Sequence, residues 1–323
     1  MYEKKGKRTF ISDFFEKNIA AYEQHIRFFA TFALINVSST NIENTMIPTI
    51  LLAMMLTATP ASAATTNISY TTNDSTAYTP LATDSIGRAP SDEHCAVETA
   101  VDFPAGSGQL QDSIRSYIAD ELKAFYPENE DGVTEPADYK GDISNGKAIV
   151  DFHSEAILAA LKKDYEQYVK DGGPKDMYMI TQSSIHKASE NDSIVTYEAT
   201  SYNFLGGAHG SSWLEGVTFR RSDGSRIDIV LDPLLVDEMQ PLLREGLNQY
   251  LSDNGTELNV DSLINGGMYL IDGLVPLPST PTYLTADGVK FVYQQYEIGP
   301  YTLGIPTFTI PLDKIRPYIL KAE

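Results

Sequence analysis

The chain has 323 residues, which at roughly 100–200 residues per domain predicts about two domains. An apolar share of 42% and a mean hydropathy of -0.21 are typical of folded cores and argue against a wholly disordered protein. Lys and Arg total 24 against 44 Asp and Glu, so the formal net charge is -20 and a polyanion such as DNA or RNA is repelled. A single cysteine, Cys95, excludes an intrachain disulfide and a cysteine-based metal cluster, and we interpret it as a small buried hydrophobic residue.

Residues 46–64 have the pattern of a secretory signal peptide. An apolar run extends from Ile47 to Ala58, and Ala61-Ser62-Ala63 matches the small-x-small cleavage pattern. A bilayer span needs about 20 apolar residues, so the run is too short for a stable anchor. The pattern predicts cleavage near Ala63 and a periplasmic or secreted protein with no stable membrane span; an uncleaved apolar segment is the alternative.

The residues before this pattern fit it poorly. A start at Met46 leaves no basic residue ahead of the apolar run, while the longer start adds 45 residues and a second apolar patch over residues 28–37. We interpret residues 1–45 as a gene-model artefact. The alternative is a cytosolic tail with an anchor, but the polar break over residues 38–44 argues against one continuous spanning helix.

The first half of the remaining chain alternates between strand and helix patterns. Residues 64–92 are rich in Thr, Ser, Asn and Ala, which is typical of a flexible linker. Alternating apolar residues predict a half-buried strand over residues 96–103, and apolar residues three and four apart predict a helix over residues 110–125. A loop is expected over residues 128–147, followed by a helix that Ser154 can cap.

The second half consists mainly of hairpins. The expected elements are strands over residues 178–187 and 194–204, a hairpin of residues 213–221 and 226–231, a helix over 237–252, and strands over 289–296 and 307–310 before a short helical tail. Hairpins mixed with helices predict an α+β fold of two modules, mostly antiparallel sheets each packed with one or two helices. The expected division is an extension and signal peptide (1–63), a linker (64–92), a small α+β domain (93–204) and a C-terminal domain (205–323).

The string Gly-Gly-Ala-His-Gly at Gly206–Gly210 is the most unusual motif. Three glycines in five residues indicate positive φ angles or a close approach by another segment. His209 is open to three interpretations, which are a structural turn, part of a binding surface, or a catalytic or metal-binding group. The other histidines of the mature chain are widely spaced, and no pair has metal-ligand spacing.

The segment from Tyr296 to Gly304 is the second candidate surface. Tyr293, Tyr296 and Tyr301 surround Glu297, and clustered tyrosines supply rigid contact area for recognition or fill a core. The acidic stretches 128–131 and 253–261 lack the EF-hand ligand order and fit solvated loops better than calcium sites. The chain contains no GxSxG, GxGxxG, Walker or HExxH motif, so the residues support no catalytic residue, metal or cofactor.

Three stretches resemble the RsiV-like C-terminal domain family. They are residues 202–210, the hairpin and helix over 216–251, and residues 296–304. The family is largely of unknown function and occurs in secreted or membrane-anchored bacterial proteins, including the anti-sigma factor RsiV and the non-catalytic part of the peptidoglycan deacetylase PdaC. The resemblance covers roughly residues 200–320, and residues 91–200 are similar to the small α/β domain that often precedes it. It implies an extracytoplasmic, non-enzymatic binding module and no catalytic residue.

The sequence therefore predicts an exported binding protein of the cell envelope or extracellular space. The expected partner is a cationic lysozyme-like protein, steered by the acidic charge, or peptidoglycan. The candidate binding residues combine glycine with His or Tyr: Gly206, Gly207, His209, Tyr296, Glu297, Tyr301 and Gly304. The alternative is a peptidoglycan-acting enzyme that uses His209 with a nearby carboxylate such as Glu297.

Overall fold

The computed structural model describes residues 78–126, 138–255, 259–263, 270 and 272–320. The expected signal peptide, residues 1–45 and residues 64–77 of the expected linker lie outside the described residues. Within the described part of the chain, no helix is both long enough and apolar enough to span a membrane.

The fold is α+β, with two sheets, each in its own module. The larger sheet has the order β1-β2-β3-β4-β5, formed by β1 (Thr83–Arg88), β2 (Cys95–Pro104), β3 (Met179–Glu190), β4 (Ile194–Phe204) and β5 (Ser211–Arg220). All neighbouring strands are antiparallel except β2 and β3, which are parallel because the two long helices connect them.

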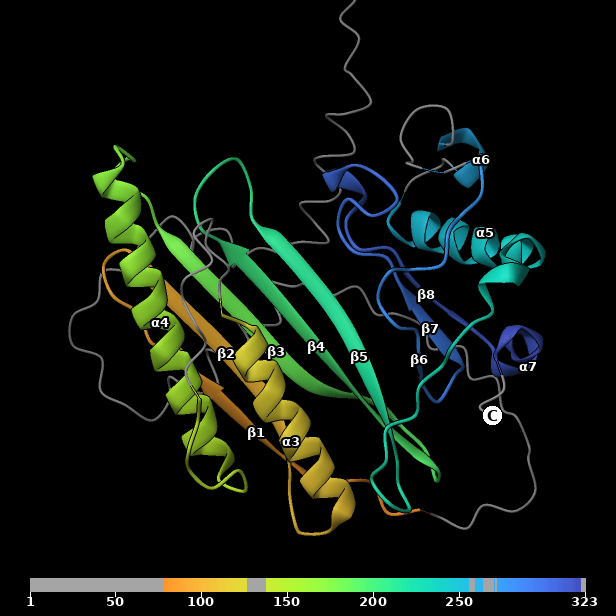
Figure 1. The fold of residues 1–323 in the computed structure, drawn as a ribbon, viewed down its shortest axis with the longest axis horizontal. Coiled ribbons are helices and arrows are strands. Elements are labelled where there is room, and N and C mark those ends of the chain that lie inside the picture. The colour runs from red at the N-terminus through yellow and green to blue at the C-terminus, as the bar shows by residue number, and fades with distance from the viewer. Residues whose placement is uncertain (1–77, 127–137, 256–258, 264–269, 271, 321–323) are drawn as a thin grey trace, which may run out of the picture.

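Two helices cover one face of this sheet, α3 (Gln109–Ala124) and α4 (Gly146–Lys170), as Figure 1 shows. Their apolar stripes meet the inward residues of β2, and the alternation of Val97, Val101 and Phe103 with the less buried Glu98 and Asp102 confirms the predicted strand. Cys95 is buried in this core, as expected, and burial raises the pKa of its thiol to about 11, so it is not a reactive thiolate.

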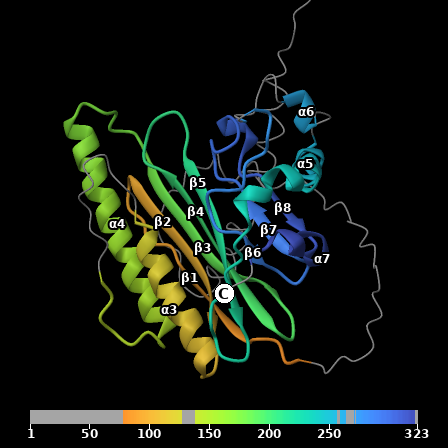
Figure 2. The same ribbon diagram turned by 45° about the vertical axis from the view of Figure 1, so that its right-hand side comes forward.

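The C-terminal module lies on the opposite face of the large sheet, next to β4 and β5 (Figures 1 and 2). Its core packs α5 (Val236–Asp253) against the sheet β6-β7-β8. The remaining elements are β6 (Tyr283–Leu284), β7 (Val289–Val292), β8 (Thr307–Ile310), α6 (Val260–Leu263), α7 (Leu312–Ile315) and the 3-10 turns η2 (Pro233–Leu235), η3 (Tyr301–Leu303) and η4 (Arg316–Tyr318).

Several expected elements differ in the structure. Residues 83–88, expected in a linker, form β1, because they pair over their whole length with residues 99–104 of β2. Helix α4 begins at Gly146 rather than near Ser154, since the Asn145 side chain accepts the Ala148 N–H and caps it; Ser154 is buried mid-helix and donates to the Thr99 hydroxyl at 3.1 Å.

The hairpin expected from residues 213–221 and 226–231 is formed only in part. Residues 226–231 make isolated bridges to Phe219, Thr282 and Ile319 instead of a continuous strand. Because β5 belongs to the large sheet, the two sheets divide after Arg220, and the expected boundary at residue 205 falls inside the β4–β5 connection.

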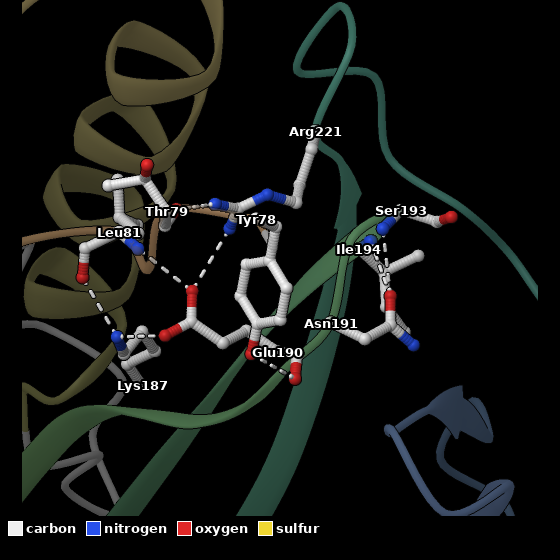
Figure 3. A network of polar contacts seen from close by, with 9 residues as sticks. All are labelled: Tyr78, Thr79, Leu81, Lys187, Glu190, Asn191, Ser193, Ile194 and Arg221. Carbon is white, nitrogen blue, oxygen red and sulfur yellow. Dashed lines mark hydrogen bonds and ion pairs between the residues drawn. The ribbon is translucent and has the colours of Figure 1, made fainter. Parts of the chain in front are cut away.

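A half-buried carboxylate, Glu190, joins the ends of three segments of the large module (Figure 3). It bonds the Lys187 ammonium at 2.5 Å, the Arg221 guanidinium at 3.0 Å and the Leu81 N–H at 2.9 Å. Arg221 also donates to the carbonyl of Thr79 and lies 5.1 Å from the centre of the Tyr78 ring. The network therefore fastens residues 78–81 to the end of the β3–β4 hairpin.

We predict that Glu190→Gln destabilises the fold by about 2–3 kcal/mol at pH 7, because Lys187 and Arg221 then lose their shared counter-ion in a largely buried site. Burial works to raise the pKa of Glu190, but Lys187, the Leu81 N–H and Arg221 outweigh it and hold the pKa below 4.5, so the difference shrinks as the pH falls below that value. Urea denaturation measures the free energy of unfolding. Asp192→Asn, an exposed acid in the same turn, is the control, and an equal loss in both variants contradicts the prediction.

Acid sensitivity is expected from His153 on α4, which is 2% exposed. Burial lowers its pKa from 6.5 to about 4, with a smaller effect of Lys123. The unfolded chain therefore binds a proton between these values that the folded chain does not, and the protein loses up to about 3 kcal/mol of stability as the pH falls from 6.5 to 4. His153→Leu is expected to remove this part of the pH dependence in denaturation curves. If the free energy of unfolding fell equally with pH in the unchanged protein and in the variant down to pH 4, this prediction would be wrong.

Candidate functional site

The β4–β5 loop and the segment after β7 meet in a cluster of three rings, His209, Tyr296 and Tyr301, called here the aromatic cluster. The rings of His209 and Tyr301 are stacked, with centroids 3.9 Å apart and planes 25° apart. The Tyr296 hydroxyl lies 2.9 Å from His209 Nε2, and its ring centroid is 5.8 Å from that of Tyr301. Two stretches about 90 residues apart in the sequence thus form one surface.

Glycine is required in the loop that presents His209. Gly206 and Gly207 have φ angles of 104° and 98°, which L side chains rarely adopt. A side chain at Gly206 would also have to displace the terminal methyl group of Met177, and one at Gly210 would enter the ring of Tyr202. Both explanations offered by the sequence, positive φ and close approach, therefore apply.

The protonation of His209 follows from its partners. Its Nδ1 lies 3.0 Å from the carbonyl oxygen of Gly210, which can only accept, so Nδ1 carries the proton. In the neutral ring Nε2 is then the acceptor, and the Tyr296 hydroxyl donates to it. The ring is fixed in one tautomer by a main-chain carbonyl and a phenol.

Tyr296 is held in a strained backbone conformation, with φ of 67° in a residue that is 51% exposed. The carboxylate of Glu297 accepts the N–H of Gln294 at 2.7 Å and that of Ser279 at 2.6 Å. Both carboxylate oxygens of Glu297 are therefore used by main-chain groups. Glu297 acts as a positioning residue that shapes the turn bearing Tyr296.

The far end of the segment is fixed by Gly304 and Tyr250. Gly304 has φ of 72° and ends η3, donating its N–H to the Tyr301 carbonyl at 3.0 Å. The Tyr250 hydroxyl of α5 donates to the Leu303 carbonyl at 2.8 Å, and burial raises its pKa to about 12, so it stays a neutral donor. Tyr301 is thereby held against His209 from the core of the C-terminal module.

The cluster offers contact area and little acid–base chemistry. No described carboxylate is hydrogen-bonded to His209, and among the described residues no group of three or more His, Cys, Asp or Glu could hold a metal ion. A surface cavity of about 460 Å³ lies elsewhere, between residues 79–82, the start of α3 and Arg221. The cluster can stack planar groups and exchange hydrogen bonds through Tyr296 and His209.

The sequence analysis predicted the residues of the aromatic cluster but not the residues that align the two modules. Gln294, 6% exposed, accepts the Leu214 N–H at 3.2 Å and donates to the Leu214 carbonyl at 2.6 Å, while Gln295 accepts the Ser212 N–H at 2.7 Å. The only signal for them is a polar Gln-Gln pair directly after an apolar strand. Tyr293, also considered for recognition, is fully buried and is a core residue.

We predict that Gln294→Leu costs about 2–4 kcal/mol of stability, because both main-chain groups of Leu214 lose their partner in a buried site. Denaturant unfolding measures the loss. Gln249→Leu, at an exposed position of α5, is the matched control and should change stability by less than about 0.5 kcal/mol. Equal stability of the Gln294 variant and the unchanged protein would show that this contact does not align the modules.

Comparison with known proteins finds a domain of unknown function in the C-terminal part of the chain. Residues 235–313 match the family model described as "Protein of unknown function (DUF3298)". No curated protein matches the sequence.

Two solved structures are similar to this chain. A DUF3298 family member from Bacteroides fragilis is 18% identical with a TM-score of 0.53, and the match covers 75% of this chain and 94% of that one. A DUF3298 family protein from Pseudomonas aeruginosa is 17% identical with a TM-score of 0.47, covering 75% and 95%. At this identity the first likeness concerns the fold alone.

Proposed function

We propose that the chain is an exported, non-enzymatic binding protein that docks a partner of the cell envelope or extracellular space on the aromatic cluster. The observation that carries the proposal is the strained, half-exposed Tyr296, fixed by Glu297 and bonded to a His209 ring that stacks on Tyr301. Backbone strain of this kind costs of the order of 1–3 kcal/mol and concentrates at functional sites. Rigid tyrosines also suit recognition because they lose little entropy on binding.

A cationic protein of the lysozyme type is the partner we favour. The net charge of -20 favours association with a basic protein, and stacked His and Tyr rings can receive guanidinium groups. The resemblance to the RsiV-like family supports the same choice, because RsiV-type proteins bind lysozyme through this region. Peptidoglycan is the second candidate, since sugar rings also pack on aromatic side chains.

The enzymatic alternative uses His209 as an acid–base group with a nearby carboxylate. Glu297, the carboxylate considered for it, is bonded through both oxygens to the N–H groups of Gln294 and Ser279. Both oxygens of this carboxylate therefore accept main-chain hydrogen bonds that hold the turn, which favours a role in binding over one in catalysis. A folded His209→Ala variant that loses turnover of muropeptides would establish the alternative.

Export rests on the pattern of residues 46–64. We expect the native host to release a protein whose N-terminus follows Ala63, with residues 1–63 absent. Fractionation with mass spectrometry of the intact protein tests this, and full-length protein retained in the cytosol would refute it.

The binding experiment measures retention of the purified protein on immobilised lysozyme and on isolated peptidoglycan, at low and high salt. We predict lysozyme binding that weakens with salt, and at least a tenfold loss of affinity in Tyr296→Ala and in His209→Ala. Tyr178→Ala, which removes an exposed tyrosine outside the cluster, is the control and should bind normally. Binding of neither ligand at low salt, or equal losses in all three variants, would overturn the proposal.

A further inference from the structure

The hydrogen bond between Tyr296 and His209 decides which polar groups the aromatic cluster offers to a partner. His209 is exposed and Tyr296 is 51% exposed, so both can be reached from solvent. With Nδ1 protonated against the Gly210 carbonyl at 3.0 Å, the neutral ring accepts the Tyr296 O–H through Nε2 at 2.9 Å. The one hydroxyl proton is thus used inside the cluster, and the Tyr296 oxygen offers only acceptor capacity outward.

Protonation of His209 reverses this hydrogen bond. The cationic ring carries a proton on both nitrogens, and the Gly210 carbonyl still accepts from Nδ1. Nε2 then donates to the Tyr296 oxygen, so the hydroxyl proton of Tyr296 turns toward solvent. One proton taken up from solvent therefore changes the exposed oxygen of the cluster from an acceptor into a donor.

Protonation also places a positive charge on the ring that stacks with Tyr301. The centroids of His209 and Tyr301 are 3.9 Å apart, so the face of the tyrosine ring is then covered by a cation of the protein itself. A guanidinium or ammonium group that approaches the cluster meets a like charge at short range. The change of charge and the reversed hydrogen bond both act against a basic partner.

No charged side chain is bonded to His209 among the residues that the structure describes. Its two ring nitrogens contact a main-chain carbonyl and a phenol. From the segment after β7, Glu297 is the acidic neighbour, and main-chain N–H groups occupy its carboxylate. The groups beside the glycines of the loop, Tyr168 of α4 and Tyr202 of β4, are phenols, which keep their proton below about pH 9. The charge on the ring is therefore not cancelled by a bonded neighbour.

We propose that His209 is a proton switch of the aromatic cluster: the neutral ring lets the cluster bind a basic side chain of a partner protein, and the protonated ring excludes it. The switch rests on the proposed function, because it regulates the same site. Imidazole rings change charge between about pH 5 and 8, so a bound partner is released as the pH falls through this range. By linkage, a bound partner in turn drives the proton off the ring.

The first test measures the affinity for immobilised lysozyme at pH 8 and at pH 5.5 in the same low-salt buffer. We expect at least about a fivefold loss at pH 5.5, because like charges about 4 Å apart repel by this much even at the dielectric constant of water. His209→Gln keeps a hydrogen-bond acceptor but takes up no proton, so it should lose most of this pH dependence. His94→Gln is the matched control, since His94 also stacks on a tyrosine, Tyr165, at 4.5 Å, and it should retain the dependence.

The second test follows the proton on the ring by NMR of histidine-labelled protein, in which the resonance missing from His209→Gln identifies His209. In the protein without ligand at pH 8, the nitrogen shifts should show a proton on Nδ1 and none on Nε2. Saturating lysozyme should displace the titration curve of this ring to lower pH. Circular dichroism at both pH values checks that each protein is folded.

The outcomes separate this switch from the proposed function. Lysozyme binding that is equal at both pH values, stronger at pH 5.5, or equally dependent on pH in His209→Gln would overturn the switch and leave the proposed function standing. Absence of lysozyme binding at pH 8 would overturn both. If His209→Gln binds at neither pH, the NMR titration of the unchanged protein decides, and a curve that lysozyme leaves in place would overturn the switch.

Discussion

The candidate site exists only because side-chain hydrogen bonds attach the C-terminal module to the large sheet. Gln294 pairs with both main-chain groups of Leu214, and the hydroxyls of Thr196 and Thr218 donate to the Leu284 carbonyl at 2.6 and 2.8 Å. Gly216 leaves space for the ring of Tyr283, which a side chain there would block. Such contacts are directional, unlike apolar burial, so they fix the register that brings His209 to Tyr301.

Elements with a clear apolar period could be predicted from the sequence, and those fixed by tertiary contacts could not. Helix α3 and strand β8 lie where their periods place them because each has one buried face. Strand β2 also lies where its period places it, although only Glu98 and Asp102 on its second face are less buried. Residues 83–88 have no such period, since they become a strand only by pairing with β2. The first turns of α4 were missed because their cap, Asn145, is typical of a loop as well.

The same division holds for the site. Glycines and tyrosines in the two motifs pointed to the aromatic cluster, because those residue types are unusual in those positions. Gln294 gave only a weak local signal, the polar Gln-Gln pair after the strand. Its role depends on a partner from another element, Leu214.

The glutamines that align the modules also close the outer edge of β5. Their amides occupy the N–H of Ser212 and both groups of Leu214, and residues 225–227 occupy the Thr218 carbonyl and the Arg220 N–H. These groups already have hydrogen-bond partners, so they cannot pair with an added strand that would extend the sheet on this side. An acidic chain that carries an exposed tryptophan on β5, an edge strand of its large sheet, is thereby hindered from pairing along this edge with its own copies at high concentration.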